Sequence, residues 1–338
     1  MQDRTQKSER YADVFKKALP ILSFIVPLII LYSLDPMVFE KTWKGRIFDI
    51  FFLWLVSMEL ILGWEKIQSR LAGVFSARTI AFVLALLLPT IYVIATNFYG
   101  LNTAIVSFSI ANNIPQPWAG AMPLSVEYLV FAMLFILIVL LEYGTKGLGK
   151  FLISTVFLGI IGMIYMIDNI YPNGRFTPFQ MIVPTTAALA ASVLGAMGYP
   201  AYLNGVASDG GSRLMVRVAG GNWAQFNVSW PCSGVESLLI YAVTILLFLK
   251  DSAFSWKQRA RYFILGAVVT YLINVLRVVT IVVIAFNNGQ DAAMAFHDYY
   301  GQLYSITWIV SYPLLIIGSR MLWAKIREWR TARPVVQV

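Results

Sequence analysis

Cysteine and histidine are nearly absent from this chain of 338 residues, which contains one of each. A single cysteine excludes an intramolecular disulfide and a second, resolving thiol within the chain. One cysteine and one histidine are also too few for a zinc site, which takes about three or four such ligands. We therefore expect no disulfide, no metal and no cofactor.

Charged residues are scarce as well: they make up 13% of the chain, while 59% is hydrophobic and the mean hydropathy is +0.70. A soluble domain has about a quarter of its residues charged, so most of this surface must face lipid. Long apolar runs in such a chain predict spanning helices, because lipid cannot satisfy the backbone of open strands. The net charge of +9 comes from basic clusters between those runs, which is typical of membrane topology rather than of nucleic-acid binding.

Eight apolar runs approach the ~20 residues needed to cross a bilayer. They lie at 18–34, 46–63, 79–96, 124–143, 151–171, 233–249, 262–286 and 303–323. A ninth segment, 182–203, is rich in Ala, Thr, Gly and Ser and has a proline near each end, which favours an interfacial or re-entrant helix. We expect an all-α polytopic membrane protein that forms one domain over residues 1–338, with a polar cytoplasmic segment at 1–17.

Charge placement orients the chain, because basic loops stay in the cytoplasm. The segment 1–17 is basic, and the loop 97–123 contains neither Lys nor Arg. With eight spans in the cytoplasmic membrane, both termini and the basic cluster at 250–261 lie inside. If 182–203 also crossed, that cluster would lie outside. Three basic residues between 41 and 46, in the first outer loop, are an exception to the pattern.

The pattern between 204 and 231 differs from the helical runs. Apolar and polar residues alternate in 213–218 and again in 225–230, and the turn-rich stretch 219–224 separates them. This predicts a small β-hairpin that must pack against helices, since two strands alone are rarely stable. In the eight-span topology the hairpin is extracytoplasmic, and its second strand leads directly to Cys232.

Cys232 opens the sixth apolar run, in the sequence Trp-Pro-Cys-Ser-Gly. A thiol at a helix N-terminus experiences the positive end of the helix dipole and unpaired N–H groups, and both favour the nucleophilic thiolate. Gly234 would allow a substrate backbone to approach closely. The alternative is a cysteine that acts as a small buried hydrophobic residue beside a helix cap.

Arg277 is the strongest anomaly of the sequence, since it lies inside an apolar run, about 13 Å from the outer end of that run by helix rise. Intramembrane arginines are costly unless they face the protein interior, and they are functional by default. Asn274 lies about one turn earlier on the same helix face. The alternative is a structural ion pair with a carboxylate such as Asp168 or Glu236.

His297 lies in the outer loop before the last span, and imidazole is the side chain best suited to proton transfer near neutral pH. Asp298 would orient the ring, although a solvated loop histidine is the ordinary alternative. The predicted topology brings Cys232, Arg277 and His297 to the same side of the membrane. A thiol nucleophile, a proton-transfer group and a cation for the oxyanion are the groups that acyl transfer requires.

These motifs resemble those of the exosortase/archaeosortase family, in which a Cys-Ser-Gly-like motif opens one span, Asn-x-x-Arg lies in the next span and a His precedes the last. Here the motifs are Cys232–Gly234, Asn274–Arg277 and His297 with Asp298. The resemblance covers roughly 182–320, and the histidine favours the bacterial exosortases. Pro231 departs from the family pattern, in which small residues precede the cysteine.

The resemblance implies a membrane cysteine transpeptidase that sorts exported proteins. Its substrates would carry a C-terminal signal made of a short motif, a transmembrane helix and a basic cluster. Cys232 would form a thioester with the cleaved chain, His297 would act as general base and then acid, and Arg277 would stabilise the oxyanion. An amine acceptor, such as a membrane lipid head group, would release the product.

Further residues would support such a site: Ser233 and Asn274 near the cysteine, and Arg213 and Arg217 on the hairpin against an acidic sorting motif. Two other functions stay open. A transporter or flippase would use Arg277 to bind an anionic head group and would not need Cys232. A lipid- or glycan-linked acyltransferase would use the same thiol on a non-peptide substrate.

Overall fold

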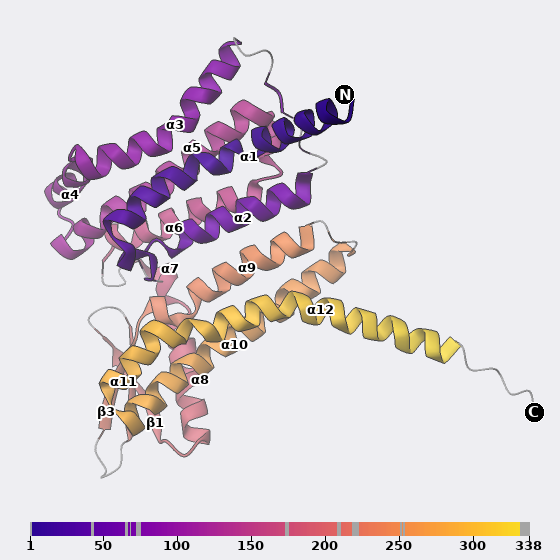
Figure 1. The fold of residues 1–338 in the computed structure, drawn as a ribbon. Coiled ribbons are helices and arrows are strands. Elements are labelled where there is room, and N and C mark those ends of the chain that lie inside the picture. The colour runs from indigo at the N-terminus through magenta and orange to yellow at the C-terminus, as the bar shows by residue number, and fades with distance from the viewer. Residues whose placement is uncertain are drawn as a thin grey trace, which may run out of the picture. The chain divides into compact units, whose positions relative to one another are not determined.

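The structure is a computed structural model, and two compact units make up the chain. The structure describes residues 2–41, 44–64, 67, 69–71, 76–172, 176–207, 211–217, 223–250, 252 and 254–331. The units are Met1–Phe176 and Thr177–Val338, and helices dominate both (Figure 1). The fold class predicted from the sequence is therefore confirmed. The prediction of a single membrane domain stays a prediction.

The first unit is a bundle of helices around α5. Its elements are α1 Gln2–Leu34, η1 Pro36–Phe39, α2 Ile47–Gly63, α3 Ala77–Phe98, α4 Leu101–Ala111, α5 Gln116–Leu148 and α6 Leu152–Ile170. Helix α5 contacts α1, α3, α4 and α6. Edge-to-face contacts among Phe24, Phe52 and Phe135 join three of the helices in the core. The segment 97–123, predicted as an outer loop, instead contains α4 and the start of α5.

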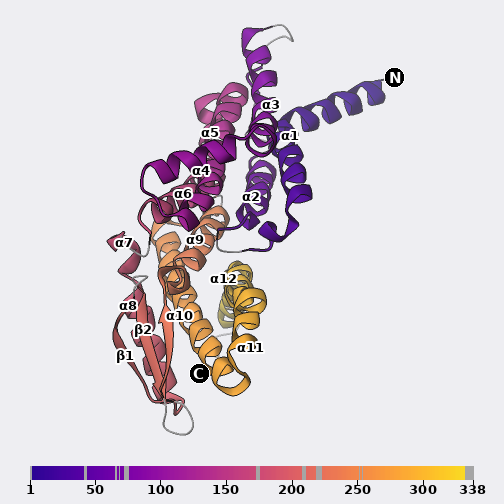
Figure 2. The ribbon, with the colours of Figure 1, turned by 90° about the vertical axis from the view of Figure 1, so that its left-hand side faces the viewer.

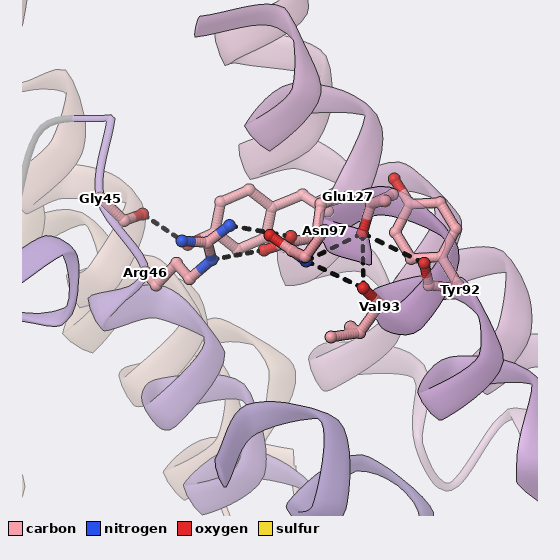
Figure 3. A network of polar contacts seen from close by, with 8 residues as sticks. Gly45, Arg46, Tyr92, Val93, Asn97 and Glu127 are labelled. Atoms are coloured by element: carbon pink, nitrogen blue, oxygen red, sulfur yellow. Dashed lines mark hydrogen bonds and ion pairs between the residues drawn. The ribbon is translucent and has the colours of Figure 1, made fainter. Parts of the chain in front are cut away.

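Two ion pairs inside this bundle account for two of the three exceptional basic residues of the first outer loop. Arg46 donates from Nε to Glu127 Oε1 at 2.7 Å and from Nη2 to Oε2 at 3.0 Å. Figure 3 shows this pair beside the end of α3 that carries Asn97. Lys44 Nζ lies 2.6 Å from Asp168 Oδ2. Because both cations have carboxylate partners in the bundle, they need not act as orientation signals.

The second unit combines long helices with a small sheet. Its elements are α7 Thr177–Gln180, α8 Val183–Ala196, β1 Ala201–Val206, β2 Ser212–Arg217, β3 Trp223–Val228, η3 Trp230–Ser233, α9 Val235–Lys250, α10 Trp256–Asn288, α11 Gln290–Ala295, η4 Phe296–Tyr300 and α12 Gly301–Thr331. Helices α9, α10 and α12 contact one another around a core that includes Tyr241 and Tyr312. Helix α8 lies between α10 and the sheet (Figure 2).

The sheet has three antiparallel strands in the order β1-β2-β3, where the sequence predicted two. The missed strand, β1, occupies the end of the segment 182–203 that was predicted as helix. Helix α8 stops earlier because Gly198 adopts a positive φ of 89° and Pro200 follows, and the chain then becomes extended. The last strand also ends at Val228, before the predicted 230, because the next residues form the 3₁₀ turn η3.

Within the described part of the chain, six helices are long and apolar enough to cross a membrane: Lys16–Leu34, Ala77–Phe98, Gln116–Leu148, Leu152–Ile170, Trp256–Asn288 and Leu303–Arg327. The other two predicted spans are helices α2 and α9, with 17 and 16 residues. Helix α8 has 14 residues. At a rise of about 1.5 Å per residue it covers about 21 Å of a ~30 Å bilayer core. Its length fits the interfacial or re-entrant helix predicted there.

Large apolar side chains on the outer surface of the long helices fit a lipid environment. Met133 on α5, Ile264 on α10 and Leu314 on α12 are 66%, 61% and 65% exposed. Soluble monomers rarely expose many large apolar side chains along helices of bilayer length. The chain is therefore a multi-pass membrane protein.

Candidate active site

Cys232 lies in the 3₁₀ turn η3, immediately before α9. The N–H of Cys232 donates to Ser229 O at 3.0 Å, and Ser233 Oγ donates to Trp230 O at 2.6 Å. Pro231 suits the first turn of a helix because its fixed φ is helical and it lacks an N–H group. The turn holds the thiol half-buried at the N-terminal end of α9, as the sequence predicted.

Two helices fix this turn from either side. Asn274 on α10 donates Nδ2 to Cys232 O at 3.0 Å. On α8, Thr186 donates its hydroxyl to Ser233 O at 3.0 Å. Gly234, with a φ of 100°, ends the turn, and a Cβ added there would lie 2.9 Å from Asn274 Nδ2. Asn274 thus approaches Gly234 closely, and the approach of a substrate backbone to Gly234 stays a prediction.

His297 is brought to the thiol by an irregular turn. It belongs to the π-helical turn η4, between α11 and α12, and its Nε2 lies 3.9 Å from Cys232 Sγ. Single π-turns are frequent at functional sites, since they reorient one side chain out of the helical pattern. The side chain of Asp298, predicted to orient the ring, lies outside the described residues.

Arg277 is buried on α10, one turn after Asn274, and is only 5% exposed. Among the described residues, Arg277 makes no hydrogen bond and no ion pair; its Nε is a buried donor without a partner. Of the two carboxylates considered from the sequence, Asp168 pairs with Lys44, and no ion pair joins Glu236 to Arg277 among the residues that the structure describes. A buried guanidinium without an anion is costly. The site is therefore complementary to a negatively charged group.

Gly301 makes room for this guanidinium. It is the first residue of α12, and a Cβ added to it would lie 2.8 Å from Arg277 Nε and 3.4 Å from Nη2. Any other residue at this position would force the Arg277 side chain to shift. Gly301 thus leaves the space in which the guanidinium lies.

The surroundings of Cys232 alter the pKa of its thiol in opposite directions. Burial raises the pKa. The hydrogen bond and the charge of His297, the charge of Arg277 and a hydrogen bond from Ser229 at 3.9 Å each lower it, and together they outweigh burial. The pKa of Cys232 therefore lies below its ordinary value. A lowered pKa increases the fraction of Cys232 that is present as the nucleophilic thiolate.

Other predicted site residues have different places. Ser233 is fully buried and closes the η3 turn. Arg213 and Arg217 lie on the same face of β2, and no contact links them to Cys232 among the described residues. Arg217 is exposed, and Arg213 Nε is buried without a hydrogen-bond partner in the described part of the chain.

Three contributors to the site were missed in the sequence: Ser229, Thr186 and Gly301. Ser229 had a detectable signal, because a serine two residues before a proline is a common helix start. Thr186 and Gly301 carried none, since each acts through a contact with a distant part of the chain.

A family comparison covers most of the chain. The model of the transmembrane exosortase family matches residues 45–315, about four fifths of the chain. The chain belongs to the transmembrane exosortase family. No curated protein and no solved structure matches it. The exosortase match includes Cys232, Arg277 and His297, and it extends the resemblance from 182–320 to α2–α6 of the first unit.

Proposed function

We propose that this exosortase is a membrane cysteine transpeptidase or peptidase that cleaves the C-terminal sorting signal of exported proteins. Membership of the family supports a membrane protein-sorting transpeptidase in general. One observation carries the finer proposal. The half-buried thiol of Cys232 lies 3.9 Å from His297 Nε2, and Arg277 is buried beside them without an anionic partner among the described residues.

In the first half-reaction, the Cys232 thiolate attacks the carbonyl carbon of the scissile peptide bond. A C–S bond forms and the carbonyl oxygen becomes an oxyanion. Arg277 stabilises that charge, which gives a role to a buried cation that has no anionic partner among the described residues. The C–N bond then breaks, and the imidazolium of His297 transfers its proton to the leaving amine. The product is a thioester on Cys232.

In the second half-reaction, an amine-bearing acceptor attacks the thioester. His297, now neutral, takes the proton from the attacking amine, so that a new amide forms and the Cys232 thiolate leaves. Water in place of the amine gives hydrolysis instead. A membrane lipid head group is a suitable acceptor for a site at the membrane surface.

The proposed orientation follows from the basic segments. Both termini lie in the cytoplasm and Cys232 lies on the extracytoplasmic side of the cytoplasmic membrane, where exported substrates arrive. The absence of Lys and Arg from 97–123 supports the same orientation.

The test is the processing of precursors that carry a motif, a single transmembrane helix and a basic cluster at the C-terminus. We expect Cys232→Ala to abolish processing and Arg277→Ala to lower its rate by about 10²–10³-fold, as loss of an oxyanion donor does. A matched control is Ser252→Ala, outside the site. Normal processing by Cys232→Ala would exclude this function and favour a transporter.

The acylated species distinguishes peptide from non-peptide substrates. Acid quenching during turnover, followed by mass spectrometry of the single-cysteine protein, identifies the group attached to Cys232. We expect a peptidyl thioester that hydroxylamine releases. A lipid or glycan acyl group on Cys232 would instead identify an acyltransferase.

A further inference from the structure

The outer edge of β3 is an open row of backbone hydrogen-bonding groups. The N–H of Arg217 donates to Pro200 O at 2.8 Å, so the odd-numbered residues of β2 face β1 and the even-numbered ones face β3. Val216 and Leu214 lie opposite Ala224 and Phe226. The backbone groups of those two β3 residues are therefore used within the sheet.

The alternate residues of β3, Trp223, Gln225 and Asn227, point their N–H and C=O groups away from β2. No described residue outside the sheet hydrogen-bonds to these backbone groups. The three side chains are exposed as well. An edge of this kind is a template for another extended chain.

The opposite edge of the sheet is not equivalent. Strand β1 pairs irregularly with β2, with a shift of register between Leu203 and Val206, and Gly205 has a positive φ of 71°. Such bulges interrupt an edge and hinder further pairing. Strand β3, in contrast, pairs with β2 in unbroken register over all six of its residues. The regular, open edge of the sheet is therefore on the β3 side.

Strand β3 is also connected to the candidate active site. It ends at Val228, four residues before Cys232, with only the start of the η3 turn between them. Phe226 packs against Phe286 at 6.4 Å between ring centroids, which fixes the strand on α10, the helix that carries Arg277. A chain lying along this edge would follow β3 towards the thiol.

We propose that an extended segment of the polypeptide substrate binds as a fourth strand along the β3 edge, through the backbone groups of Trp223, Gln225 and Asn227, and so enters the site at Cys232. Main-chain pairing would supply affinity for many sequences, because it needs only the substrate backbone. This inference rests on the proposed function, and it adds how the substrate is held.

The protein variant that tests it is Gln225→Pro in the full-length protein. Proline removes the outward N–H and places a ring at the edge, while no hydrogen bond to β2 is lost. The matched control, Ala201→Pro, places proline on the β1 edge, where the N–H also points away from β2.

The substrate is a peptide spanning the cleavage site of a precursor whose processing requires Cys232. Acylation of Cys232 by p-nitrophenyl acetate, which has no chain to pair, is measured in parallel.

We expect Gln225→Pro to lower kcat/KM for the peptide about tenfold, mainly through KM, since the loss of one or two hydrogen bonds has effects of this size. Ala201→Pro should cleave the peptide like the wild type, and both variants should retain acylation by p-nitrophenyl acetate. Equal cleavage by the two variants would overturn strand addition and leave the proposed function intact. If the wild-type protein neither cleaves the peptide nor acylates Cys232, the proposed function fails as well.

A substrate series decides the question without altering the protein. Each backbone N–H of the peptide is methylated in turn. Pairing along one edge uses every second N–H, so cleavage should fall at alternate positions with a period of two. If methylation were tolerated at every position, or if it abolished cleavage at every position, the proposal would be overturned.

Discussion

At the scale of single residues, Cys232 is placed where burial and charge act on the thiol in opposite directions. Burial would leave it a poor nucleophile, and the nearby His297 and Arg277 reverse that effect. The contact between Cys232 Sγ and His297 Nε2 is long, at 3.9 Å. Catalytic hydrogen bonds are often long before substrate binds. A separation of 3.9 Å is therefore compatible with the proton transfer that we propose between the two side chains.

The pH dependence of alkylation tests whether the pKa of Cys232 is lowered. The rate of reaction with iodoacetamide follows the thiolate fraction. Because the pKa of Cys232 is lowered, the midpoint of this rate against pH should lie below the pKa of an ordinary thiol, which is about 8.5. In His297→Ala the hydrogen bond and the charge are lost while burial remains, so the midpoint should move up. The protein has one cysteine, so the rate reports on this thiol alone.

The control is a cysteine in place of exposed Asn112 in a Cys232→Ser background, which should titrate in the ordinary range. An unchanged midpoint in His297→Ala would mean that the imidazole does not act on the thiol.

Gly301 should be required for the position of Arg277. A methyl group at Gly301 would lie 2.8 Å from Arg277 Nε and displace the guanidinium. We expect Gly301→Ala to lower the processing rate at least about tenfold, towards that of Arg277→Ala, while Cys232 still reacts with iodoacetamide. Gly318→Ala on the same helix is the control, because an added Cβ there meets nothing within 4 Å. Equal activity of the two variants would show that Arg277 tolerates the shift.

At the scale of elements, specific contacts join the helices of each unit. In the second unit, Gly266 on α10 leaves no room for a side chain: an added Cβ would overlap Tyr241 Oη on α9 and lie 2.5 Å from Tyr312 Cε1 on α12. In the first unit, the bidentate pair of Arg46 and Glu127 joins the start of α2 to α5. A buried pair of this kind specifies which helix faces fit together.

Breaking that pair should destabilise the first unit strongly. The side chains of Arg46 and Glu127 are 14% and 4% exposed, so Glu127→Ala leaves a buried cation and should cost about 3–5 kcal/mol. The measurement is thermal unfolding in detergent micelles. Glu127→Gln, which keeps a hydrogen-bond acceptor, should lose less.

The control for this prediction is Glu40→Ala, which removes an exposed carboxylate and should change stability by no more than about 0.5 kcal/mol. Equal melting temperatures for Glu127→Ala and Glu40→Ala would show that the ion pair contributes nothing to stability.

At the scale of the whole molecule, the candidate active site lies entirely within the second unit, Thr177–Val338. The nucleophile, the imidazole, the buried arginine and the sheet all come from it. The family match nevertheless extends over the first unit from residue 45. The family model therefore includes helices of the first unit as well as the residues that we propose to react.

Labelling with a membrane-impermeant methanethiosulfonate tests the orientation of the whole protein. Added to intact spheroplasts, it should label Cys232 without opening the membrane. In a Cys232→Ser background, a cysteine replacing exposed Lys257 should react only after permeabilisation, and one replacing exposed Asn112 should react at once. Labelling of Cys232 only after permeabilisation would place the site in the cytoplasm and contradict the proposed function.

The sequence alone determined the membrane class and the positions of the eight long apolar helices, because apolar runs of bilayer length are local properties, whereas the short helix α4 was not predicted. It also singled out Cys232, Arg277 and His297 as candidate site residues, because they are the only cysteine, an arginine inside an apolar run and the only histidine. The hairpin was recognised, but β1 was not. Its residues continue an apolar segment, and only pairing with β2 makes them a strand.

Tertiary structure alone decided the contacts between distant residues. The sequence does not show that Asn274 holds the carbonyl of Cys232, that Gly301 lies against Arg277, or that Lys44 and Arg46 have carboxylate partners. Each of these depends on which helix faces meet. The free edge of β3 likewise exists only because the register of three strands fixes the direction of every backbone N–H.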